Sequence, residues 1–112
     1  MSFQPCVVTT TTATRAEAEA IGLALLEKCL AACVQYEMVT SQYVWQGEMC
    51  CAEEVRLSIK SCMSLFPLLE DVVMRLHPYD CPEIVACPLQ GSAAYLAWME
   101  ETLGACGFFS AS

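Results

Sequence analysis

The segment Leu76–Glu83, which reads Leu-His-Pro-Tyr-Asp-Cys-Pro-Glu, carries the densest set of chemically capable side chains in this sequence. Its two prolines stiffen a loop that holds an imidazole, a phenol, two carboxylates and a thiol. Rigid loops with such side chains are common places for function. His77 is the only histidine, and two roles stay open for it: a metal ligand, or a hydrogen-bonding group that fixes the loop.

Lys60 is a second candidate, because it ends a predicted strand and Lys28 is the only other lysine. It could anchor an anionic ligand, or it could be a solvated side chain at the end of the strand. The sequence has no Gly-rich phosphate loop and no nucleophile elbow, so we expect no Ser-His-Asp triad, and one histidine is too few for a His-based catalytic zinc site. We therefore expect a binding protein rather than an enzyme.

Nine cysteines and six methionines make a sulfur-rich composition that suits soft metals such as Cu(I) without locating a site. The cysteine count is odd and no Cys-x-x-Cys pair occurs, so we expect mostly reduced thiols that act as small core hydrophobes. Cys29 and Cys33 would lie one turn apart on a predicted helix; a metal pair is possible there, but a core role is the commoner one.

The composition predicts one soluble domain over residues 1–112, with its core at about residues 6–104. The hydrophobic fraction of 56% is more than a small monomer can hide, which predicts subunit contacts. A net charge of −8 disfavours nucleic acid and anionic membrane surfaces as partners. The first residues show no export signal, so we expect a cytoplasmic location.

The order of predicted elements is strand, helix, strand, strand, helix, strand, helix. Thr14 and Glu17 have the spacing of a capping box, which predicts that the first helix starts at Arg15 and extends to about Cys33. The other elements follow from apolar periodicity, turn residues and the His77-Pro78 stop: strands at 6–12, 34–46, 49–62 and 83–89, and helices at 64–76 and 93–103. This is an α+β chain on the ferredoxin-like βαββαβ plan with an extra C-terminal helix.

The two middle strands form a hairpin whose arms exceed the usual strand length of about five or six residues. Val55, Leu57 and Ile59 alternate with polar residues in the return arm, as in a sheet with one face on the core. Tyr43 and Trp45 lie on a part of the hairpin that 112 residues cannot cover. We expect other subunits to cover it.

Three sequence blocks carry a family pattern: Glu27–Val34 with Leu-Ala-Ala-Cys, Ser41–Gly47 with Tyr-x-Trp-x-Gly, and His77–Ile84 with His-Pro-Tyr-x-x-Pro-Glu. With them the chain resembles the CutA divalent-cation-tolerance family from Val7 to about Leu103. The resemblance implies a ferredoxin-like subunit in a tight homotrimer whose long hairpins pair between neighbours, similar to PII signalling proteins. It also implies a role in tolerance of copper and other divalent metals, with no established reaction.

This sequence has only part of the metal site that is described for bacterial members of that family. It uses a Cys at the position of Thr10 and two consecutive His at the positions of Leu76 and His77, so only His77 matches. Cys81 could substitute for a lost ligand, and we expect copper or another divalent cation to bind weakly, because affinity needs several N or S ligands in one geometry.

Three functions follow as hypotheses. The first is a cytosolic trimeric module that binds or senses metal. The second is a PII-like effector-binding protein with an intersubunit cleft built from Trp45, Lys60, His77 and Tyr79. The third is an assembly factor whose trimer is the working surface.

Overall fold

The computed structural model describes residues 2–105, so residues 1 and 106–112 of the predicted domain, including Cys106, lie outside the described residues. It has an α+β architecture with four strands and three α-helices, together with a short 3₁₀ turn at Met63–Leu65 before the second helix. In chain order the elements are β1 Pro5–Thr12, α1 Arg15–Glu27, β2 Cys33–Trp45, β3 Glu48–Cys62, α2 Phe66–Leu76, β4 Val85–Pro88 and α3 Ala93–Gly104. No helix of the described residues is long and apolar enough to cross a membrane.

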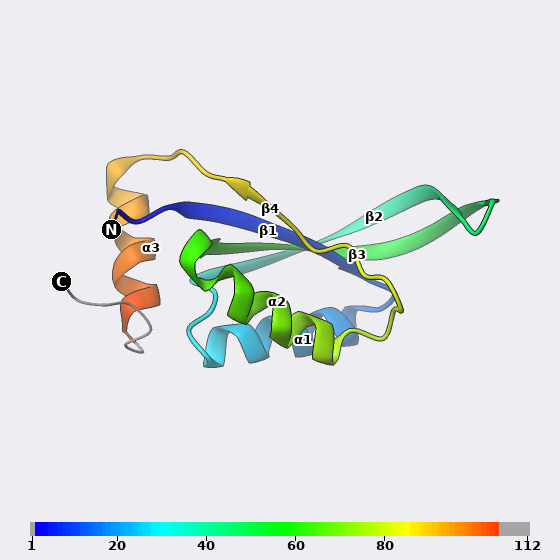
Figure 1. Ribbon diagram of the computed structural model, residues 1–112, viewed down its shortest axis with the longest axis horizontal. Coiled ribbons are helices and arrows are strands. Elements are labelled where there is room, and N and C mark those ends of the chain that lie inside the picture. Colours follow the sequence, from blue (N-terminus) through cyan, green and yellow to red (C-terminus); the bar gives the residue numbers. More distant parts are fainter. Residues whose placement is uncertain (1, 106–112) are drawn as a thin grey trace.

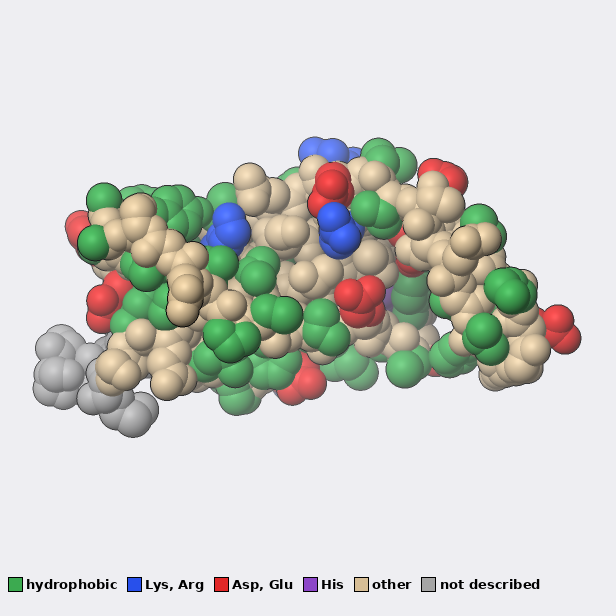
Figure 2. Space-filling view, turned by 90° about the horizontal axis from the view of Figure 1, so that it is seen from above, with side chains coloured by type: hydrophobic (Ala, Val, Ile, Leu, Met, Phe, Trp, Pro, Cys, Tyr) green, Lys and Arg blue, Asp and Glu red, His purple; other side chains and the backbone are tan. Residues whose placement is uncertain are grey.

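The strands form one antiparallel sheet in the order β2-β3-β1-β4. Helices α1 and α2 pack side by side against one face, and α3 stands at the end of the sheet remote from the hairpin turn (Figure 1). The described residues place no such helical layer on the other face of the sheet, and Figure 2 looks down on it.

The core lies between the sheet and the two helices. Val55, Leu57 and Ile59 of β3 point into it and are at most 1% exposed, as their alternation predicts. Helix α1 contributes Ile21 and Leu25, and α2 contributes residues such as Leu69 and Val73. Each buried side chain of this size stabilises the fold by about 1.5–3 kcal/mol relative to exposure. Leu76 at the end of α2 is 47% exposed and takes no part in this core.

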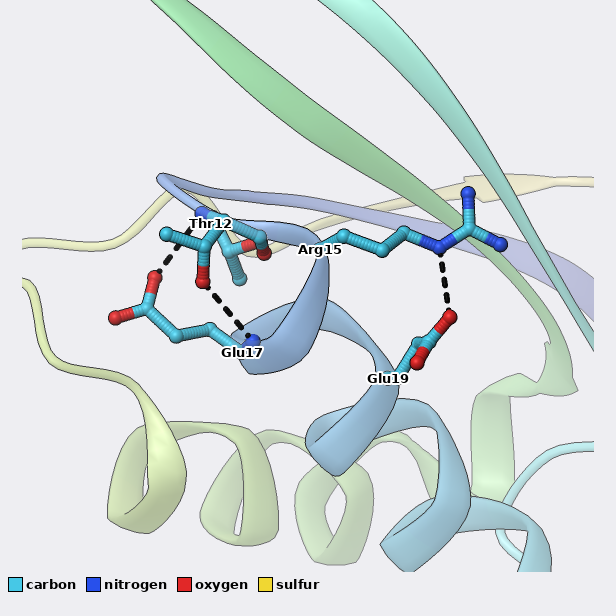
Figure 3. Close-up of polar contacts among 5 residues, drawn as sticks. Thr12, Arg15, Glu17 and Glu19 are labelled. Carbon is cyan, nitrogen blue, oxygen red and sulfur yellow. Dashed lines mark hydrogen bonds and ion pairs between the residues drawn. The ribbon is translucent and has the colours of Figure 1, made fainter.

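The start of α1 is fixed by the predicted capping box. The Thr14 hydroxyl accepts from the Glu17 amide at 3.2 Å, and the Glu17 carboxylate accepts from the Thr14 amide at 3.2 Å (Figure 3). One turn later, Arg15 donates to Glu19 at 2.8 Å. The same Arg15 guanidinium lies 4.7 Å from the centre of the Tyr36 ring and so connects α1 to β2.

The end of α1 differs from the prediction, because the helix stops at Glu27 and not near Cys33. Cys29 has a φ of 55°, in the left-handed region, and its amide donates to the Leu26 carbonyl. The next amide, that of Leu30, donates to the Leu25 carbonyl at 2.9 Å. These two bonds form a Schellman cap, which normally uses glycine at the left-handed position. Cys33 consequently belongs to β2, so the proposed helical pair of Cys29 and Cys33 does not exist.

Strands β2 and β3 form the predicted long hairpin, which extends well beyond the two helices (Figure 1). Residues Gln46 and Gly47 make the turn with φ values of 51° and 81°. Positive φ at both positions is the type I′ geometry, whose twist matches that of the paired strands. The molecule therefore extends to 50 Å along its longest axis.

Gly22 allows α1 to approach β2. A Cβ atom at Gly22 would lie 2.0 Å from the Tyr36 hydroxyl oxygen, 3.0 Å from Tyr36 Cζ and 3.3 Å from a Val34 methyl group. Glycine inside a helix costs about 1 kcal/mol relative to alanine, so this close approach explains its presence.

We predict that Gly22→Ala lowers the free energy of unfolding by about 2 kcal/mol, because the clash outweighs the gain in helix propensity. In a Tyr36→Phe background the nearest obstacle is gone, and the penalty should shrink by about 1 kcal/mol or more. Urea denaturation of the four proteins measures both effects. Equal penalties in the two backgrounds would show that the Tyr36 hydroxyl is not what excludes a side chain at position 22.

Candidate functional site

The ring of His77 joins the loop after α2 to the end of β1. Helix α2 stops before it because His77 precedes Pro78 and has extended backbone angles. The ring is 8% exposed, its Nε2 lies 2.7 Å from the Thr11 carbonyl oxygen, and its Nδ1 accepts from the Tyr79 amide at 3.2 Å. An amide can donate only to an unprotonated nitrogen, so the proton sits on Nε2 and is donated to Thr11.

Both ring nitrogens are therefore engaged inside the chain. Of the two roles left open by the sequence, this geometry favours the one in which His77 fixes its loop. A metal ion could use the ring only after one of these hydrogen bonds breaks.

Tyr79 makes the second attachment of this loop to the sheet. Its ring packs 4.7 Å from the His77 ring, and its hydroxyl donates to Glu54 Oε2 at 2.8 Å. Burial raises the pKa of Tyr79 well above its ordinary value, and the hydrogen bond to Glu54 raises this pKa further because the carboxylate favours the protonated phenol. Tyr79 thus acts as a neutral donor.

A cleft of about 780 Å³ lies between this loop and the hairpin, from Glu54 to Trp45 beside the turn. We call it the hairpin cleft; twelve residues line it, from the end of β1, the hairpin and the loop: Thr11, Thr40, Ser41, Gln42, Tyr43, Trp45, Glu54, Pro78, Tyr79, Asp80, Cys81 and Glu83. Three of these residues are acidic and none is Lys, Arg or His. The cleft is therefore a negatively charged, partly aromatic site.

The structure brings together most of the residues that the sequence singled out. Trp45, Tyr79 and Cys81 all line the hairpin cleft, and His77 holds the loop that forms one wall. Lys60 does not join them. Lys60 lies six positions after Glu54 along β3, which corresponds to about 20 Å of extended strand.

At that position Lys60 is engaged elsewhere. Its Nζ donates to the Gln35 side chain at 3.2 Å and lies 5.6 Å from the centre of the Tyr95 ring of α3. Within one chain Lys60 therefore lies apart from Trp45, His77 and Tyr79, and their grouping in a cleft between subunits stays a prediction.

Glu54 is the main residue of the site that sequence reasoning missed. Its place in the polar set of β3 predicts a side chain facing water, but it is 7% exposed because the loop after α2 covers it. Thr11 was missed for the same reason, since it lies on the open face of β1 under this loop. The neighbouring Thr10 points into the core, where its hydroxyl has no hydrogen-bond partner.

The described residues contain no group of three or more His, Cys, Asp or Glu side chains arranged to hold a metal ion. Free thiols occur at seven described positions: Cys6, Cys33, Cys50, Cys51, Cys62, Cys81 and Cys87. Burial raises the pKa of the Cys6 thiol to about 11, with smaller contributions from Cys62 and Cys87, so Cys6 behaves as a core residue. Cys81 is exposed and is the thiol of the hairpin cleft.

A model of the family described as CutA1 divalent ion tolerance protein matches residues 6–102. The chain belongs to this family. It is 43% identical over 100 residues to the divalent-cation tolerance protein CutA of Thermus thermophilus, a match that covers 88% of this chain and 97% of that protein. It is 42% identical to human protein CutA over 86 residues, which cover 75% of this chain and 48% of the human protein.

Solved structures agree with this membership. The divalent cation tolerance protein of Thermus thermophilus superposes with a TM-score of 0.84 at 42% identity, covering 88% of this chain and 97% of that one. A periplasmic divalent cation tolerance protein CutA from Archaeoglobus fulgidus gives a TM-score of 0.86 at 34% identity, covering 88% and 98%. The CutA resemblance predicted from three sequence blocks is confirmed.

The pKa of Tyr79 is higher in the folded protein than in the unfolded chain, where it is about 10. Its phenol therefore contributes its full share to the free energy of unfolding below about pH 10, and this share is lost only as pH rises through the higher folded pKa. At about pH 11 Tyr79 should still be protonated in the folded protein. The Tyr79→Phe variant should then show the same tyrosinate absorbance as the wild type. Circular dichroism confirms that both samples stay folded.

Because burial also raises the pKa of Tyr36, a loss of about a quarter of the signal or more in Tyr79→Phe would show that Tyr79, one of four tyrosines, ionises normally.

Proposed function

We propose that this protein works in tolerance of divalent metal ions as a cytoplasmic homotrimeric binding module rather than as an enzyme. Family membership supports the connection with divalent cations. The observation that carries the proposal is the hairpin cleft, whose carboxylates and thiol can attract a cation but offer no pairing of a nucleophile with a free general base. His77, the usual candidate for such a base, has both nitrogens engaged.

The edge strand β2 supports the trimer. Within the part of the chain that the structure describes, this strand of 13 residues pairs only with β3, which leaves a long row of backbone donors and acceptors along its other side. Such an edge is a template for pairing with another chain. Met38, Val44 and Met49 are 67%, 68% and 79% exposed on the same hairpin, so a partner would also bury apolar surface. We propose a PII-like arrangement of ferredoxin-like subunits paired through these hairpins.

The donor set of the cleft supports weak binding. Cys81 brings the one sulfur of its lining, and Asp80 and Glu83 on the same loop bring carboxylates, but among the described residues no three such side chains are grouped to hold a metal ion. Copper prefers several N or S ligands, so one chain provides an incomplete copper site. Residues from a neighbouring copy would be needed to complete a tighter one.

A second function, binding of a small-molecule effector as in PII-like proteins, is favoured by the size of the cleft. Its volume of about 780 Å³ lies in the range of small-molecule sites and far exceeds what one metal ion fills.

Calorimetric titration with Zn²⁺ under reducing conditions tests the proposed function, and light scattering on the same sample gives the mass of the assembly. We expect weak Zn²⁺ binding to a particle of about three times the mass of one chain. Cys81→Ser should weaken this binding about tenfold, because a soft ligand is lost.

Cys51→Ser is the matched control. Cys51 is also an exposed thiol, but it lies on the hairpin and does not line the cleft. A monomer would contradict the proposed assembly. Equal Zn²⁺ affinity in the two variants would show that the hairpin cleft does not bind the metal.

A further inference from the structure

Cys29 differs from the other cysteines of the described residues. It is bonded in a disulfide, whereas the seven thiols named above are free. The sequence has nine cysteines, and the ninth is Cys106, which lies outside the described residues. Within one chain, Cys106 is therefore the cysteine left to pair with Cys29.

The backbone at Cys29 also indicates a role for its side chain. Its φ of 55° places it in the left-handed position of the cap after α1, where glycine is the usual residue. A residue with a Cβ atom is disfavoured in this conformation, so the cap alone does not explain a cysteine. Cys29 is partly exposed, in contrast to the buried thiols of Cys6 and Cys62.

The loop after α1 and the helix α3 lie at the same end of the sheet (Figure 1). The loop is attached to β3 by two hydrogen bonds. The Ala32 amide donates to the Lys60 carbonyl at 2.8 Å, and the Ser61 hydroxyl donates to the Leu30 carbonyl at 2.7 Å. Helix α3 meets the same end of β3, because the Lys60 Nζ lies 5.6 Å from the centre of the Tyr95 ring.

The core connects the two segments that carry these cysteines. Leu30 follows Cys29 directly, and Leu103 comes three positions before Cys106; both leucines belong to the same buried cluster. Three residues span at most about 10 Å, and the Cα atoms of a disulfide lie about 4.4–6.8 Å apart. Cys106 is thus a short length of chain away from the core that Leu30 enters.

We propose that Cys29 and Cys106 form a redox-responsive disulfide that ties the segment after α3 to the cap of α1. Glutathione disulfide is the oxidant. The Cys29 thiolate attacks one of its sulfurs, which forms a mixed disulfide and releases one glutathione. The Cys106 thiolate then attacks the Cys29 sulfur and releases the second glutathione. Two electrons and two protons pass from the cysteine thiols to the two glutathione thiols, so an excess of glutathione reverses the reaction.

Reversibility suits the cytoplasmic location given under the proposed function, on which this part of the inference rests. Glutathione keeps most thiols reduced there, and the disulfides that do form are usually transient and redox-sensing. A bond from position 29 to position 106 closes most of the chain into a loop, which restricts the unfolded state. We therefore expect oxidation to stabilise the fold.

Peptide mapping without reduction tests the pairing. The protein is equilibrated with glutathione disulfide, its free thiols are alkylated, and it is cut after Lys, Arg and Glu. Cys29 then lies in the peptide Cys29–Glu37 together with Cys33, and Cys106 lies in Thr102–Ser112. We expect mass spectrometry to find these two peptides joined. The joined peptide should be lost in Cys29→Ser and persist in Cys33→Ser, the matched control, since Cys33 is a free thiol of the same peptide.

Thermal unfolding measures the effect of the bond on stability. The oxidised wild type should melt at least about 5 °C above the protein reduced with dithiothreitol, because the bond restricts the unfolded chain. Cys33→Ser should keep this difference, whereas Cys29→Ser and Cys106→Ser should abolish it. Circular dichroism before each melt verifies that the variants are folded.

Absence of the joined peptide in the oxidised wild type would overturn the inference. Its persistence in Cys29→Ser would do the same by assigning the bond to Cys33, and a mass of two linked chains under denaturing, non-reducing conditions would place the bond between copies. The Zn²⁺ titration is made under reducing conditions, with this bond open. Its outcome therefore bears on the proposed function alone.

Discussion

The hydrogen bond between the His77 ring and the Thr11 carbonyl is the constraint on which the site depends. It closes a contact between residues 66 positions apart in the chain and ties the loop after α2 to the end of β1. The same ring accepts from the Tyr79 amide, which orients that residue toward β3. These bonds hold Tyr79 in place over Glu54, and this part of the loop forms one wall of the hairpin cleft.

The second constraint is the reach of the hairpin beyond the helices. Pairing with β1 ends at Val55, so Glu54 and the residues before it lie on a two-stranded ribbon. A ribbon of this kind is stable only when other groups pack on it. The loop after α2 covers its base, and this produces a cleft that is acidic and aromatic. The outer part of the ribbon stays uncovered within one chain, and this is the part through which the proposed trimer would pair.

Local sequence signals predicted the elements well, because capping, alternation and proline act over a few residues. The Thr14–Glu17 box, the inward face of β3 and the stop at His77-Pro78 are all confirmed. The left-handed Cys29 was not predictable, since glycine is the usual signal there. The burial of Glu54 and the separation of Lys60 from the cleft depend on which loop covers which part of the sheet, and no local pattern encodes that.

The central claim, that His77 serves as a fixed hydrogen-bonding clamp, can be tested by ¹⁵N NMR of the imidazole, whose signals are unambiguous because the chain has one histidine. The account predicts that Nε2 donates to Thr11, that Nδ1 accepts from the Tyr79 amide, and that neither signal moves on addition of Zn²⁺. A proton on Nδ1 would contradict this hydrogen-bond pattern, and a large Zn²⁺-induced shift of either ring nitrogen would contradict the clamp and make His77 a metal ligand.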